Sequence, residues 1–148
     1  MSSTIAADTN LLARLIVRDD PAQTELARLE VKRAARVIVP LPVLCELVWI
    51  LRGRYRTPPA DIADALEALL SVENVVADVE AAGLGLALLR AGGDFADGVI
   101  AEQGKRAGAK AFVSFDRAAV KKLTNLGEAA RLPLADVDAP RPDPKPAA

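Results

Sequence analysis

Hydrophobic positions along the chain alternate between short apolar runs and longer stretches in which apolar residues recur every three or four positions. The short runs predict buried strands, at 5–7, 37–39, 75–76, 111–115 and 132–137. The longer stretches predict helices with one apolar face, at 10–17, 21–35, 42–54, 59–70, 79–91, 95–107 and 117–123. Strands that alternate with helices favour an α/β sandwich with a mostly parallel sheet.

Length and composition change this picture little in the first 138 residues. A chain of 148 residues with 51% hydrophobic content suits one domain, which we assign to 1–138. In 139–148 every second residue from Pro140 to Pro146 is proline, which predicts an extended and flexible tail. The N-terminus lacks the pattern of a signal peptide, and no apolar run reaches the ~20 residues of a membrane span. We therefore expect a cytoplasmic protein.

Composition also limits the chemistry. The chain contains no histidine, which excludes Ser-His-Asp and Cys-His catalysis and a histidine-built zinc site. Its single cysteine, Cys45, excludes internal disulfides and cysteine-rich metal sites. The net charge of -1 means that nucleic-acid binding would need a local basic patch. Carboxylates are the remaining strong ligands, and they suit hard cations such as Mg²⁺ or Mn²⁺.

Acidic residues stand where predicted strands pass into predicted helices. Asp8 follows the first strand and Asp116 follows the strand at 111–115. Strand carboxyl ends are where α/β sheets hold their ligands, which favours a functional role. A plain helix N-cap explains either residue equally well. For Asp94, which follows a Gly-Gly turn, we favour the N-cap interpretation.

Two further acids lie inside predicted helices. Glu46 interrupts an apolar run, and its helical neighbours are apolar. A buried charged carboxylate is costly unless it is paired or binds a metal, so we expect a ligand, with a buried salt bridge as the alternative. Asp97 lies in a first helical turn, where the helix dipole alone explains an acid. Its small neighbours Gly98 and Ala101 would let a metal ion and a phosphate approach.

Three stretches of this chain resemble the PIN domains of VapC-type toxin ribonucleases: ADTNLL, VPLPVLCELVWIL and DFADGVIAEQGKRAGAKAFVSFD. The resemblance covers residues 4–137. It implies a three-layer α/β/α sandwich and an acidic cluster that binds one or two Mg²⁺ or Mn²⁺ ions and hydrolyses RNA phosphodiester bonds. It also implies a homodimer and a small antitoxin partner that holds the enzyme inactive. Matched to the motifs, the catalytic and metal-binding residues are Asp8, Glu46, Asp97 and Asp116.

The same match implies accessory roles for four residues. Thr9 and Asn10 complete the DTN motif, and Asn10 would orient the acids. Ser114 could hold a metal-bound water, and Asp94 occupies an often acidic position. Separately, arginines and lysines near the motifs are candidates for steering RNA phosphates, with Arg117, next to Asp116, and Arg14 as the RNA-binding positions that we select.

The residues disfavour two other interpretations of the sequence and leave two open. A receiver domain would need an aspartate where the strand at 37–39 ends, but Pro40 stands there. A haloacid-dehalogenase-like phosphatase would need a second acid two positions after Asp8, where the chain has Asn10. A non-catalytic partner-binding module with a PIN fold and a PIN-type DNA nuclease remain as alternatives.

Overall fold

Acidic N-caps set where most of the helices begin. In the computed structural model, which describes residues 3–134, the Asp20 carboxylate accepts a hydrogen bond from the Gln23 amide at 3.1 Å, and Asp78 does the same for Ala81. The helices are α1 (Thr9–Val17), α2 (Pro21–Arg33), α3 (Leu41–Gly53), α4 (Pro59–Leu70), α5 (Val79–Arg90), α6 (Phe95–Arg106) and α7 (Arg117–Asn125). The predicted helices are therefore confirmed, with ends that shift by one or two residues.

The strands are short and all of their pairings are parallel. They are β1 (Thr4–Ala6), β2 (Arg36–Ile38), β3 (Val75–Val76), β4 (Phe112–Val113) and β5 (Ala130–Arg131). One sheet has the order β1-β2-β3, and a second consists of β4 and β5. The expected α/β class with parallel strands is confirmed. The strands fall into two sheets, however, and β1 and β4 do not pair with each other in the part of the chain described.

The last strand differs from its prediction. We expected it at 132–137, but β5 ends at Arg131, and residues 132–134 form no strand. Pro133 explains the early end, because proline has no amide hydrogen to donate to a neighbouring strand. Residues 135–137 and the proline-rich segment 139–148 lie outside the described residues.

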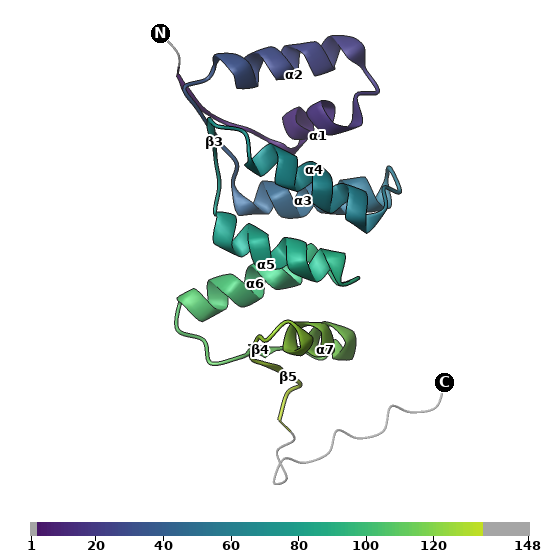
Figure 1. The fold of residues 1–148 in the computed structure, drawn as a ribbon, viewed down its shortest axis with the longest axis vertical. Helices are drawn as coiled ribbons and strands as arrows, with labels where there is room; N and C mark the ends of the chain where they lie inside the picture. The colour runs from purple at the N-terminus through teal and green to yellow at the C-terminus, as the bar shows by residue number, and fades with distance from the viewer. Residues whose placement is uncertain (1–2, 135–148) are drawn as a thin grey trace, which may run out of the picture.

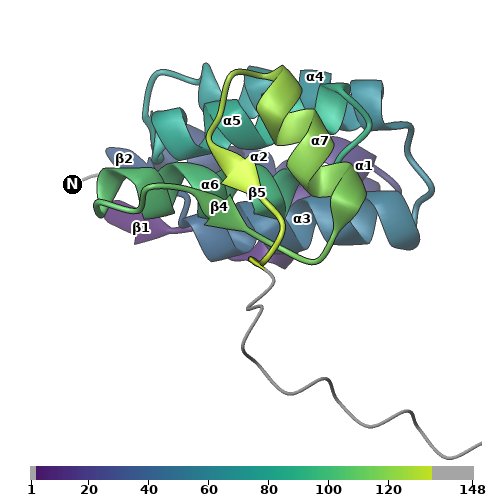
Figure 2. The ribbon, with the colours of Figure 1, turned by 90° about the horizontal axis from the view of Figure 1, so that it is seen from below.

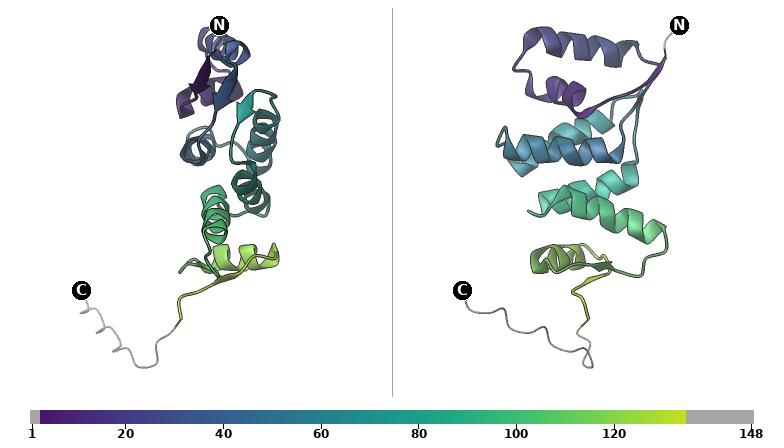
Figure 3. Two further views of the ribbon diagram at one scale, coloured as in Figure 1. Left: turned by 90° about the vertical axis from the view of Figure 1, so that its left-hand side faces the viewer. Right: turned by 180° about the vertical axis from the view of Figure 1, so that it is seen from behind.

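The elements stack roughly in chain order along the long axis (Figure 1). Helices α1 and α2 lie at one end, and α7 with β4 and β5 lies at the other, so these last elements are in front when the molecule is seen from below (Figure 2). The α5–α6 pair lies between the two sheets, as both views in Figure 3 show. The C-terminal elements are therefore joined to the first sheet through α5 and α6.

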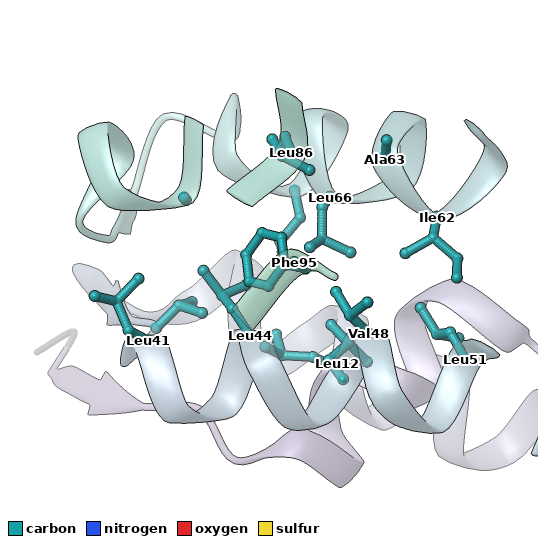
Figure 4. Close-up of a cluster of buried hydrophobic side chains, with 14 of the residues drawn as sticks. Leu12, Leu41, Leu44, Val48, Leu51, Ile62, Ala63, Leu66, Leu86 and Phe95 are labelled. Atoms are coloured by element: carbon teal, nitrogen blue, oxygen red, sulfur yellow. The ribbon is translucent and has the colours of Figure 1, made fainter. Parts of the chain in front are cut away.

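Most of the core lies between α3, α4 and the helices next to them. Leu44 and Leu51 of α3 and Leu66 of α4 are fully buried. Phe95, the first residue of α6, inserts between Leu44 and Leu66 (Figure 4). A second, smaller cluster joins Leu88, Ala101 and Leu123 from α5, α6 and α7. Helix α6 thus contributes to both clusters and connects them.

Glycines let the backbones of α5 and α6 come into direct contact. A Cβ atom added at Gly98 of α6 would lie 2.6 Å from Gly85 Cα of α5 and 2.7 Å from the Leu84 carbonyl oxygen. Arg106 of α6 also forms an ion pair with Asp78, the N-cap of α5. The pair is therefore held by close backbone packing in the middle and by opposite charges at one end.

No helix in residues 3–134 is long and apolar enough to span a membrane.

We predict that Gly98→Ala destabilises the protein by about 2 kcal/mol. Its Cβ would meet backbone atoms that cannot rotate away, and this outweighs the ~1 kcal/mol that alanine gains over glycine in a helix. Urea unfolding followed by circular dichroism measures the change.

Gly104→Ala is the matched control in the same helix. Its Cβ would meet only the Ala109 Cβ at 3.6 Å, an ordinary contact, so the helix propensity of alanine should leave stability unchanged or slightly higher. Equal effects of the two substitutions would contradict the close packing of α5 on α6.

Candidate acidic site

Three of the candidate acids gather around the start of α6 and the start of α7. Asp94 is the N-cap of α6 and accepts a hydrogen bond from the Ala96 amide at 2.7 Å. Asp97 lies in the first turn of the same helix. Asp116 follows β4 and caps α7, accepting from the Ala119 amide at 3.1 Å. The N-cap interpretation is therefore correct for Asp94 and Asp116.

Electrostatics connects these three side chains. Asp97 is half-buried, and this burial is the main reason why its pKa lies above the ordinary value of 3.8. The carboxylates of Asp94 and Asp116 raise the pKa of Asp97 further. Each additional negative charge makes ionised Asp97 more costly. A bound cation would therefore stabilise the ionised form of Asp97.

Asp8 and Glu46 are carried by other elements of the fold. Asp8 follows β1 and caps α1, accepting from the Leu11 amide at 2.9 Å. Glu46 is exposed on α3, so the expectation of a buried glutamate is wrong. The reason is that α3 buries the face that carries Leu44, Leu47 and Val48, and Glu46 points away from it.

The four acids do not form one closed cluster. Within residues 3–134, no three acidic or cysteine side chains lie close enough to hold a metal ion. The prediction relied on one parallel sheet whose strand ends would bring Asp8 and Asp116 together. Here β1 and β4 belong to separate sheets. The assignment of all four acids to one metal site therefore stays a prediction.

These acids nevertheless share an electrostatic feature. None of Asp8, Glu46, Asp94, Asp97 and Asp116 forms a salt bridge with any residue in 3–134, whereas other acids of α4, α5 and α6 pair with arginine or lysine. Unpaired carboxylates are the oxygen donors that hard divalent cations prefer. The donor chemistry therefore fits Mg²⁺ or Mn²⁺, and Asp94, Asp97 and Asp116 are the members of the set whose charges act on one another.

The predicted accessory and RNA-binding residues differ in burial and in the partners that they contact. Ser114 Oγ accepts a hydrogen bond from the Asp116 amide at 3.0 Å and thereby fixes the turn that presents Asp116. Thr9 is buried, and Asn10 is exposed. Arg14 is engaged in a salt bridge with Asp19 at 2.7 Å, which weakens its candidacy for binding RNA.

The arginines and lysines near the motifs divide into two groups. Arg117 is exposed and has no ion pair within the described residues. Lys105 and Arg106 are occupied by acids of the protein itself. Arg117 therefore keeps its place as the better RNA-binding candidate of the two that we selected.

A small cavity beside Asp94 was not predicted from the sequence. Its volume is about 280 Å³, and it is lined by residues of α3 and of the α6 N-terminus, among them Cys45, Trp49, Arg52 and Phe95. Burial, and then the charge of Asp94, raises the pKa of the Cys45 thiol. The only signal in the sequence was an aromatic residue just before an arginine-rich segment. A larger cavity of about 1050 Å³ between α1, α2 and α4 is lined by none of the candidate acids.

Comparison with known proteins identifies one family. No curated protein matches the chain. The family described as PIN domain matches residues 5–124, well over half of the chain and including all of the candidate acids. PIN domains are generally metal-dependent nucleases, and they act on nucleic acid. The chain therefore belongs to the PIN domain family.

Proposed function

We propose that this protein is a metal-dependent endoribonuclease, the toxin of a VapBC-type toxin–antitoxin pair. The observation that carries the proposal is the group formed by Asp94, Asp97 and Asp116. They lie at the first turns of two helices, no cation pairs with them in residues 3–134, and the charges of Asp94 and Asp116 make the ionised form of Asp97 more costly. Membership of a nuclease family supports the hydrolytic activity, and the VapC-like motifs support RNA as the substrate.

In this proposal the carboxylates hold the cation. Asp94, Asp97 and Asp116 would bind Mg²⁺ or Mn²⁺, with Asp8 and Glu46 as further ligands that the motifs predict. When bound, such an ion lowers the pKa of water and stabilises charge on phosphate oxygens. Asp94 and Asp116 each use one carboxylate oxygen as an N-cap acceptor, which fixes the side chain and leaves the other oxygen for a ligand. Ser114 Oγ accepts a hydrogen bond from the Asp116 amide and so helps to position Asp116.

The phosphodiester must reach a negative site. Arg117 stands next to Asp116 at the start of α7, where a helix N-terminus also attracts phosphate. Lys121 and Lys122 follow on the same helix. Since the net charge of the chain is only -1, such local cations would supply the attraction, and binding should weaken as salt rises.

We predict that Asp97→Asn lowers RNA cleavage by at least about 100-fold, because even residues that only support metal ligands are worth ~10–100-fold. The assay is cleavage of a labelled RNA in Mg²⁺ or Mn²⁺, with a chelator added to stop it. Asp61→Asn is the matched control, since Asp61 also lies in a first helical turn but is exposed on α4.

The substrate class is tested in the same assay. A DNA strand of the same sequence should remain intact, and efficient DNA cleavage would favour the DNA nuclease instead. Normal RNA cleavage by Asp97→Asn would show that the site is assigned to the wrong residue. A folded protein that neither cleaves nor binds metal would favour the partner-binding module.

We predict that Asp97→Asn is more stable than the parent protein at pH 7 when a chelator is present. The pKa of Asp97 is raised in the folded state, so the folded protein binds this proton more tightly than the unfolded chain does. The stability from this group is therefore complete below about pH 4 and is lost as the pH rises through the raised pKa.

Thermal unfolding at about pH 3.5 and at pH 7 tests the sign of this effect. The two proteins should differ little in acid, and the variant should have the higher Tm at neutral pH. Added Mg²⁺ should raise the Tm of the parent more than that of the variant, because a ligand that binds only the folded state stabilises it. A variant that is less stable than the parent at pH 7 in chelator would contradict the prediction.

The toxin role makes its own prediction. Expression of the parent protein in a bacterial host should arrest growth, and expression of Asp97→Asn to the same level should not. If a short reading frame lies beside this gene, co-expression of its product should restore growth, and that product should co-purify with the chain. Growth arrest by both forms would show that the toxicity does not depend on RNA cleavage, and it would contradict the toxin mechanism.

A further inference from the structure

Trp49, the only tryptophan of the chain, lies on α3 with 76% of its surface exposed. Large aromatic side chains normally remove most of their surface from water. Trp49 instead shares the outer face of α3 with Glu46 and Gly53, opposite the face that packs into the core. The Trp49 side chain therefore contributes little to the core and is accessible to an external partner.

The ring of Trp49 stands at the edge of the 280 Å³ cavity next to Asp94. Helices α3 and α6 pack together here, and Val48 and Phe95 belong to the shared core (Figure 4). Arg52, one turn after Trp49, lines the same cavity and donates from Nη1 to the Gly93 carbonyl oxygen at 3.4 Å. An aromatic face, a guanidinium and an acidic residue of the candidate site therefore border one hollow.

Positive charge continues from this cavity into the loop that follows α3. Arg52, Arg54 and Arg56 alternate with other residues, and none of the three forms a salt bridge within the described part of the chain. The Arg54 guanidinium lies over the Tyr55 ring, 5.6 Å from its centroid. Arginines interleaved with aromatic rings are typical of surfaces that bind single-stranded nucleic acid, because the rings stack on bases while the cations contact the backbone.

We propose that Trp49 stacks on an unpaired RNA base and, with Arg52 and Arg54, forms a platform that places single-stranded RNA beside Asp94. This inference rests on the proposed ribonuclease function, and it specifies the substrate as unpaired rather than duplex RNA. A base inside a duplex is already stacked on both faces, so it could not cover the indole. The 280 Å³ hollow next to the ring would then receive part of one nucleotide.

Charge favours RNA over a second copy of this chain as the occupant. The core of a protein–protein interface is apolar and depleted of charge, and its rim is polar. The exposed neighbours of Trp49 are Glu46 and Arg52, and three arginines without ion pairs follow within seven residues. A polyanion satisfies all of those cations, whereas the same face of a second copy would bring the same arginines again, with Glu46 as the one carboxylate among the exposed neighbours of Trp49 named above.

Because the chain has one tryptophan, its fluorescence reports directly on this platform. The protein is titrated with a single-stranded RNA of about eight nucleotides in a chelator, which prevents cleavage, and then with the same sequence as a duplex. We expect the single strand to quench the emission and the duplex to leave it nearly unchanged. The affinity for the single strand should fall as salt rises.

Three variants assign the effect, with affinity measured by fluorescence anisotropy of labelled RNA. Trp49→Ala should weaken single-strand binding by roughly 10-fold to 100-fold, the range expected for the loss of one base–aromatic stack, and Trp49→Phe should keep most of it. Leu26→Ala is the matched control, since Leu26 is 64% exposed on α2 and borders no candidate acid. It should leave the affinity unchanged.

The outcomes separate this inference from the proposed function. Single-strand quenching with weakened binding by Trp49→Ala supports the platform, whether or not the protein cleaves RNA once metal is added. RNA cleavage by a protein whose Trp49 emission is not quenched, or whose affinity is unchanged in Trp49→Ala, overturns the platform and leaves the ribonuclease intact. A dimer that sedimentation shows to dissociate in Trp49→Ala, without quenching by RNA, would assign the residue to a second copy and also overturn it.

Discussion

The close approach of α5 and α6 determines where the candidate site can form. At Gly98 the two backbones come so near that even a methyl group would overlap Gly85. This contact fixes the direction of α6, and with it the positions of Asp94 and Asp97 at its first turn. The other side of α6 carries Ala101 into the cluster with Leu123 of α7. The position of Asp116, at the start of α7, therefore also depends on this helix pair.

Structural and functional interpretations of the acids prove compatible. Asp94 and Asp116 are N-caps, and an N-cap uses one carboxylate oxygen. The bond to the amide holds the side chain in one orientation, so the second oxygen is presented in a fixed direction. Asp97 differs, because no hydrogen bond or ion pair within residues 3–134 offsets its burial. A residue that costs stability where the fold does not need it is typical of a functional position.

Local patterns in the sequence predicted the elements well. Helix α4 begins and ends at the predicted residues, Pro59 and Leu70, because proline at the first position and a clear apolar face mark both limits. The sequence left the N-cap and the functional interpretation of Asp8 and Asp116 equally open, and the structure confirms that both residues are caps. Pairing between strands was harder to predict, since β1 and β4 are too short for their side chains to specify a neighbour. The separation of Asp8 from Asp116 follows from that pairing and has no local signal.

The same limit explains α3. Glu46 was expected to be buried because its helical neighbours are apolar, but a helix as apolar as α3 offers more than one hydrophobic face, and tertiary packing selects one. The fold buries the face of Leu44 and Leu51 and leaves Glu46 and Trp49 exposed. A face that exposes both a carboxylate and an indole beside the acidic site adds nothing to the core. The indole and the neighbouring Arg52 are better explained by a ligand with aromatic rings and negative charge, and a strand of nucleic acid has both.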